Sequence, residues 1–181
     1  MNTMQTRRDR VRQAAIDEIK SIAWEIANEQ GMDDVTVNGI ARRMGMTPPA
    51  FYSYFKSRDD LITALIIEAY RSYRKALEDA RDSVPESDSA GRLYRVFIAY
   101  REWAIANPNL FGLFAGRRVQ GFEAEDPQIL AAAEAVYQLF AELYNKAWQQ
   151  GAIHVAHRPQ GFPAAYAEQL KEAVAKRALQ A

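Results

Sequence analysis

The chain has 181 residues, nearly half of them hydrophobic and a quarter charged, a balance typical of globular proteins that bury a core. It contains no cysteine, which excludes disulfides and thiolate chemistry, and no apolar run near the ~18 residues of a membrane-spanning helix. The net charge is zero. No apolar stretch near the start predicts a secretory signal, so we expect a cytoplasmic protein without a membrane partner.

The first half of the chain predicts a series of helices. Residues 8–30 carry small and branched apolar side chains at steps of three and four, which indicates one buried helix face. Gly31 can take positive φ and is expected to end that helix. A short helix over 37–44 follows, with Thr36 as its N-cap and Gly45 in the turn after it.

A third short helix is expected from Thr47, its N-cap, to Phe55. Pro48 and Pro49 favour a sharp helix start, because the N–H that proline lacks would be unpaired in the first turn. Phe51 and Phe55 are four residues apart and should face the interior. The tyrosines between them should face outward.

The second half also follows the helical period. Helices are predicted over 57–81, 91–106, 110–114 and 128–150, with a helix-prone but weakly amphipathic tail over 164–179. No stretch alternates as a strand does, so the predicted fold class is all-α.

Charge points to a polyanionic partner for the segment between the second and fourth helices. Residues 35–58 contain four basic side chains and no acidic one, and four arginines within residues 7–12 could form an arm onto phosphate or the minor groove. Tyr52, Lys56 and Arg58 are expected at phosphates, and Ser53 and Tyr54 at base edges. The residues expected to contact a duplex are Thr36, Asn38, Arg42, Thr47, Pro48, Pro49, Ala50, Tyr52, Ser53, Tyr54, Lys56 and Arg58.

The segment VTVNGIARRMGMTPPAFYSYFKSRDDLI resembles the DNA-binding segment of the TetR family of bacterial transcriptional repressors. Tyr54 stands where histidine is commoner, and Arg58 where lysine is commoner. The resemblance covers roughly residues 8–62, about a third of the chain. The matching residues are Thr36, Ile40, Ala41, Gly45, Met46, Tyr52, Tyr54, Phe55, Arg58, Asp59 and Leu61.

The resemblance implies a three-helix helix-turn-helix domain (residues 1–56) and a helical bundle (57–181) that binds a small-molecule effector and forms a homodimer. Effector binding would release a double-stranded DNA operator. No cofactor, metal or catalytic activity is expected. The candidate effector site consists of Phe97, Tyr100, Trp103, Phe111, Phe114, Tyr137, Phe140 and Tyr144, with Trp148 nearby.

Other interpretations remain open at this point. Each of these aromatic residues could belong to an ordinary core, since aromatic side chains dominate cores as well as sites. The chain could be a DNA-binding regulator controlled by a protein partner, or a helical interaction or enzymatic module whose helix-turn-helix is incidental. His154 and His157 are too few ligands for a metal site. The broken stretch after residue 150 leaves the dimer geometry open.

Overall fold

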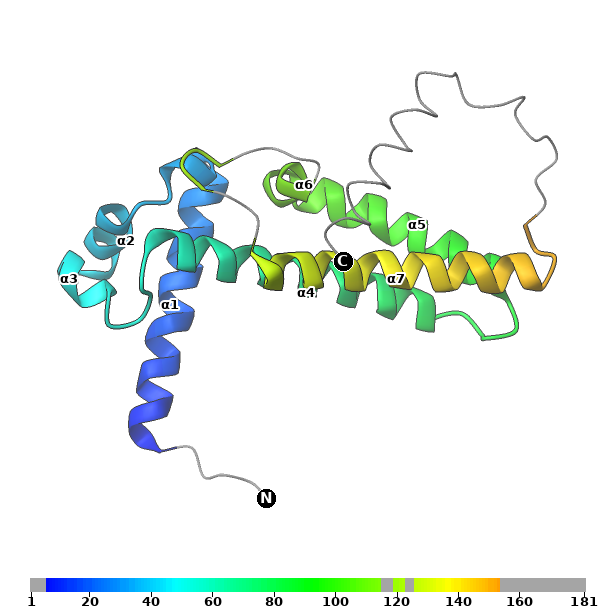
Figure 1. Ribbon diagram of the computed structural model, residues 1–181, viewed down its shortest axis with the longest axis horizontal. Coiled ribbons are helices and arrows are strands. Elements are labelled where there is room, and N and C mark those ends of the chain that lie inside the picture. The colour runs from blue at the N-terminus through cyan, green and yellow to red at the C-terminus, as the bar shows by residue number, and fades with distance from the viewer. Residues whose placement is uncertain (1–5, 115–118, 123–125, 154–181) are drawn as a thin grey trace, which may run out of the picture.

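The structure, a computed structural model, describes residues 6–114, 119–122 and 126–153 (Figure 1). Within these residues the chain is helical and contains no strand, which confirms the all-α prediction. The elements agree with the predicted ranges within two residues, except for the third helix. They are α1 (Arg7–Gln30), the 3₁₀ helix η1 (Met32–Asp34), α2 (Val37–Met44), α3 (Pro48–Phe51), α4 (Arg58–Asp82), α5 (Ser89–Ala106), α6 (Pro108–Phe114) and α7 (Pro127–Gln149).

The turns of the N-terminal part follow from the residues at the helix ends. Gly31 ends α1 with φ of 105°. The Thr36 hydroxyl accepts a hydrogen bond from the Gly39 N–H at 3.1 Å and so caps α2. Gly45 ends α2 in the left-handed region, with φ of 64°, where a side chain would be strained. The structure therefore confirms all three predicted helix ends.

The third helix is shorter than predicted, and the role expected of Thr47 is wrong. α3 begins at Pro48 and is regular only to Phe51, and the Thr47 side chain makes no capping hydrogen bond. Tight turns continue the coil: the Tyr54 N–H donates to the Phe51 carbonyl at 2.9 Å, and the Phe55 N–H donates to the same carbonyl at 3.2 Å. The predicted range therefore consists of one helical turn followed by looser turns.

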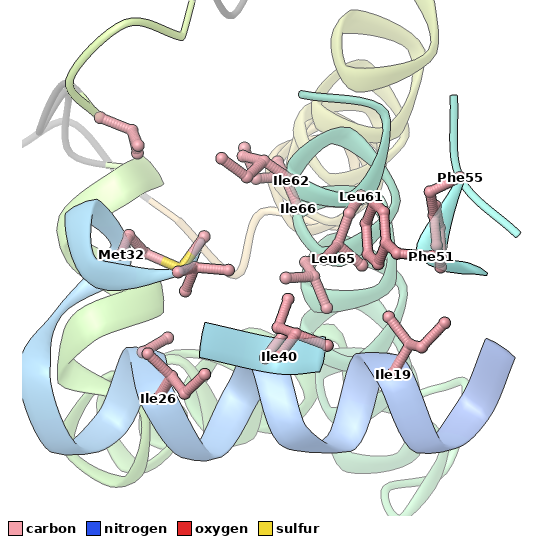
Figure 2. Close-up of a cluster of buried hydrophobic side chains, with 14 of the residues drawn as sticks. Ile19, Ile26, Met32, Ile40, Phe51, Phe55, Leu61, Ile62, Leu65 and Ile66 are labelled. Atoms are coloured by element: carbon pink, nitrogen blue, oxygen red, sulfur yellow. The ribbon is translucent and has the colours of Figure 1, made fainter. Parts of the chain in front are cut away.

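Two hydrophobic clusters meet along α4. The first joins α1, η1, α2 and α3 to the first turns of α4; Phe51 and Leu61 are completely buried there, and Phe51 stacks on Phe55 at 5.7 Å (Figure 2). The second joins the rest of α4 to α5 and α7, around Leu77 and Val96. We call residues 6–66 the head. The predicted division at residues 56 and 57 stays a prediction, since α4 contributes to both clusters.

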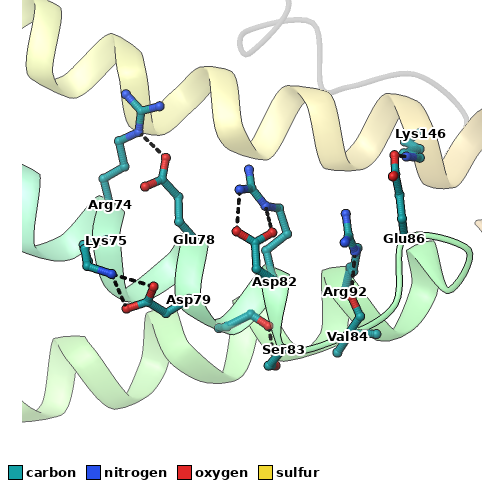
Figure 3. Close-up of polar contacts among 12 residues, drawn as sticks. Arg74, Lys75, Glu78, Asp79, Asp82, Ser83, Val84, Glu86, Arg92 and Lys146 are labelled. Atoms are coloured by element: carbon teal, nitrogen blue, oxygen red, sulfur yellow. Dashed lines mark hydrogen bonds and ion pairs between the residues drawn. The ribbon is translucent and has the colours of Figure 1, made fainter.

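Helices α4, α5 and α7 pack lengthwise against one another, and α2 and α3 lie at one end of the molecule (Figure 1). Polar contacts hold the far end of this bundle: the Arg92 Nε donates to the Val84 carbonyl at 2.9 Å, and Lys146 pairs with Glu86 (Figure 3). None of the described helices is long and apolar enough to cross a bilayer. The predicted tail helix and both histidines lie outside the described residues.

Candidate nucleic-acid interface and internal cavity

The turn around α3 lies at one end of the molecule (Figure 1), and most of its residues are exposed. Pro48 and Pro49 are exposed at the start of α3. Tyr52 is 55% exposed, and its ring meets the buried Phe51 ring edge-on at 5.6 Å. Ser53 is also exposed. Buried Phe51 therefore anchors the turn while its neighbours remain accessible.

Fewer cations are available on this surface than the sequence suggests. Arg43 forms ion pairs with Glu29 at 2.5 Å and with Glu25 at 3.6 Å. The hydrogen bond from Arg43, followed by its charge, lowers the pKa of Glu29. Arg42 and Lys56 are exposed, and neither side chain has a hydrogen bond or ion pair within the part of the chain that the structure describes.

Arg58 does not have the role predicted for it. Its guanidinium donates to four backbone carbonyls of the protein: Nε to Val35 at 2.6 Å, Nη1 to Gln120 at 3.2 Å, and Nη2 to Met32 at 3.3 Å and Asp33 at 3.2 Å. The side chain lies in the first turn of α4, and these bonds direct it toward η1 rather than toward α3. The expectation that Arg58 is free to contact phosphate is therefore corrected.

Two further expectations change near the start of α1. Tyr54 is half-buried against the first cluster and lies under the Arg12 guanidinium, 5.5 Å from the ring centre, so it is less free than predicted. Arg12 also donates to the Ser53 carbonyl at 2.8 Å. Residues 7–12 form the first turns of α1 and not an extended arm.

A cavity of about 290 Å³ lies between α4, α5, α6 and α7. We call it the aromatic cavity. Its volume lies at the lower end of the range for small-molecule sites, roughly 300–1,000 Å³. It contains five of the eight predicted effector residues, which come from three different helices. The lining residues are Tyr70, Tyr73, Tyr100, Phe111, Phe114, Ala133, Val136, Tyr137 and Phe140.

The other three predicted effector residues lie elsewhere. Trp103 is only 8% exposed and stacks on Phe114 at 5.5 Å, behind the cavity wall. Phe97 and Tyr144 are 41% and 45% exposed, so they belong to the outer surface of α5 and α7. The interpretation as ordinary core fits Trp103.

The sequence does not single out Tyr70 and Tyr73 of α4 as cavity residues. Both lie within the predicted helix over 57–81, and nothing in the period of that helix separates a residue that faces a hollow from one that faces a packed core. Burial, followed by the nearby hydroxyls of Tyr100, Tyr137 and Tyr70, raises the pKa of Tyr73 far above its usual value. All four of these tyrosines line the aromatic cavity.

Residues 119–122 connect this part of the molecule to the head. Val119 is 5% exposed and packs in the first cluster. The Gln120 N–H donates to the Asp33 carboxylate at 2.6 Å, while the Gln120 carbonyl accepts from Arg58. These two hydrogen bonds attach the segment to η1 and to the start of α4.

The sequence of the chain is similar to those of known proteins. A model for bacterial regulatory proteins of the tetR family matches residues 19–65. The chain is also 30% identical over 140 residues to the HTH-type transcriptional regulator Rv1816 of Mycobacterium tuberculosis, in an alignment that covers 75% of this chain and 60% of that protein. Residues 19–65 therefore form a helix-turn-helix segment of the TetR type. The chain spans less than two thirds of the length of that relative.

Solved structures extend the similarity beyond the TetR-family segment. The putative regulatory protein SCO4313 is 28% identical with a TM-score of 0.56, over 97% of this chain and 100% of that one. A protein of unknown function from Rhodococcus sp. RHA1 has a TM-score of 0.65 at 22% identity, over 79% of this chain and 70% of that one, and shows the fold alone.

Proposed function

We propose that this chain is a sequence-specific DNA-binding repressor that acts as a homodimer and leaves its operator when a small molecule binds. The observation that carries the proposal is the α3 turn, in which buried Phe51 holds exposed Pro48, Pro49 and Tyr52 at the end of the molecule. Such a turn has the width and the mixed apolar and hydroxyl surface that suit the major groove of a duplex.

The charges around this turn favour DNA as the partner. Arg42 and Lys56 are exposed cations, and the first turns of α1 add further arginines. They would neutralise phosphates and position the head, while Ser53 and the prolines meet base edges and thymine methyls. After the corrections to Arg58 and Tyr54, the proposed contact set is Thr36, Asn38, Arg42, Thr47, Pro48, Pro49, Ala50, Tyr52, Ser53 and Lys56.

The aromatic cavity supports the effector part of the proposal. Its α6 wall, Phe111 and Phe114, precedes the 119–122 segment that is bonded to the head. A ligand that prefers the cavity with those rings displaced would favour a different head position, by as much as its affinities for the two states differ.

An exposed apolar stripe on α7 supports the homodimer. Leu130, Tyr137 and Tyr144 recur every seven residues and are 60%, 69% and 45% exposed, and Trp148 follows at 58%. A helix that shows one face of this kind to water is suited to pair with another copy. Tyr137 also lines the aromatic cavity, so the proposed interface borders it.

The proposal is tested by selecting duplexes from a random library and measuring their affinity by fluorescence anisotropy at several salt concentrations. Tyr52→Ala should weaken binding to the selected duplex. The matched control is Arg95→Ala, which removes an exposed arginine of α5 and should leave binding unchanged. Failure to enrich any duplex, or equal loss in both variants, would contradict DNA binding through α3.

The effector step is tested separately with Ala133→Trp, which places a large ring in the aromatic cavity. This variant should bind the selected duplex as the wild type does. Compounds that raise the melting temperature of the wild-type protein and release the duplex should do neither with the variant. Release that persists in the variant would place the effector elsewhere.

A further inference from the structure

A second hollow adjoins the aromatic cavity and shares Tyr70 with it. It measures about 350 Å³ and lies between α4 and α7. We call it the arginine groove. Its residues from α4 are Ile67, Tyr70, Arg71 and Arg74, and its residues from α7 are Gln128, Ala131, Ala132 and Ala135.

The spacing of these residues explains why the groove exists. Both sets follow the pattern i, i+3, i+4, i+7, so each forms one face of its helix. Three of the four residues on α7 are alanines, which cannot reach across to α4. The two helices therefore pack with an open channel at this level, while Val136 and Phe140 fill the space further along α7.

The groove carries positive charge that the described residues do not neutralise. Arg71 is exposed and has no hydrogen bond or ion pair within residues 6–114, 119–122 and 126–153. Arg74 pairs through Nε with Glu78 at 2.8 Å, and no bond of its terminal nitrogens is found among these same residues. Among the described residues that line the groove, none is acidic. One paired and one unpaired guanidinium leave a net charge of about one unit.

The neighbouring aromatic cavity is mostly apolar, in contrast to the charged arginine groove. Four tyrosines, Tyr70, Tyr73, Tyr100 and Tyr137, line this cavity among otherwise apolar side chains, and no hydrogen bond of their hydroxyls is found in the described part of the chain. A wholly apolar ligand would leave without a partner any of these hydroxyls that it covers. Tyr70 stands at the junction, where its ring stacks on Phe114 at 3.9 Å.

We infer that the effector is an amphipathic monoanion, such as a medium-chain or aryl carboxylate. Its apolar body occupies the aromatic cavity, and its anionic group passes Tyr70 into the arginine groove beside Arg71. The guanidinium donors and the Tyr70 hydroxyl would bind the carboxylate through charge-assisted hydrogen bonds. This inference rests on the proposed function and specifies the chemical class of the effector.

The test compares probes that share a body and differ in charge. Decanoate, decanamide and decylammonium, with naphthoate and naphthamide as an aromatic pair, are titrated calorimetrically into the full chain at neutral pH. At least one anion should bind roughly tenfold more tightly than its amide, the effect of about one charged hydrogen bond at a partly solvated site. Decylammonium should bind least.

Two variants then test where the anionic group of the ligand binds. Arg71→Gln keeps the polarity and much of the length of the side chain and should reduce the affinity for the anion to that for its amide, with the amide unaffected. Arg95→Gln, an exposed arginine of α5 that lines neither hollow, should change nothing. Circular dichroism verifies that both variants are folded.

Three results would overturn the inference: equal affinity for anion and amide, an unchanged preference in Arg71→Gln, or no binding of either anion. Failure of the proposed function gives a different result. In that case the anion binds with the expected charge preference, but the selected duplex is not released when it binds.

Discussion

Replacing Arg58 with alanine separates a structural role from a DNA-binding one. The four carbonyls that Arg58 contacts belong to η1, the residue that follows it, and the 119–122 segment. Removing the guanidinium would therefore loosen three parts of the molecule at once. A phosphate contact would instead leave the free protein unchanged.

The expected loss of stability in Arg58→Ala depends on how deeply the four carbonyl acceptors are buried. The bonds to Val35 and Met32 are part-buried, and each should contribute about 1–1.5 kcal/mol, less than the full value for a charged donor because Arg58 is partly exposed to water. The bonds to Asp33 and Gln120 are exposed, so water replaces them at little cost. We expect Arg58→Ala to lower the free energy of unfolding by about 2–3 kcal/mol. For a chain of this size, that corresponds to a melting temperature lower by roughly 5–10 °C.

Thermal and urea unfolding followed by circular dichroism measure this loss. Lys56→Ala is the matched control, because it removes a neighbouring exposed cation and should change stability by no more than about 0.5 kcal/mol. Arg58→Lys should recover little, since one ammonium cannot span several carbonyls. An Arg58→Ala protein with unchanged stability, but a salt dependence of DNA binding reduced by about one unit, would refute the reasoning.

Further variants test the head. Lys56→Ala should weaken binding to all duplexes and reduce the salt slope by about one, measured by anisotropy, whereas Ser53→Ala should change which bases are preferred in a repeated selection. Gly45→Ala should destabilise by about 1–2 kcal/mol, because the left-handed turn opposes a side chain, and Gly45→Asn should cost less in the same unfolding assay. Phe51→Ala should lose about 3–5 kcal/mol, seen as a lower urea midpoint, and equal stability would contradict its place in the core.

Local chemistry made most of the fold predictable. The helix ends at Thr36 and Gly45 depend on a few neighbouring atoms, and the inward direction of Phe51 and Phe55 follows from their spacing. The predicted third helix is too long because the same spacing also suits one turn of helix followed by tight turns. Thr47 has the position of a cap, but its side chain makes no bond to the next turn.

The site was harder to predict, because it depends on partners far apart in the chain. Arg58 lies in a segment without acids, yet its acceptors are backbone carbonyls, which a charge pattern does not reveal. Phe97 and Phe140 lie on facing helices, and their spacing does not indicate which ring meets a hollow; of the two, Phe140 alone lines the aromatic cavity. The family resemblance indicated the α3 surface, and the tertiary contacts supplied the rest.

The 119–122 segment packs with the head although it is distant from it in sequence. Val119 completes the interior of the N-terminal part although it lies far along the chain from the first turns of α4. A fragment cut after residue 66 would therefore lack a piece of its own packing and both bonds to Gln120. In the mechanism that we propose, the part that would move when an effector binds is discontinuous in sequence, and mutations around Gln120 should change DNA affinity without contacting DNA or effector.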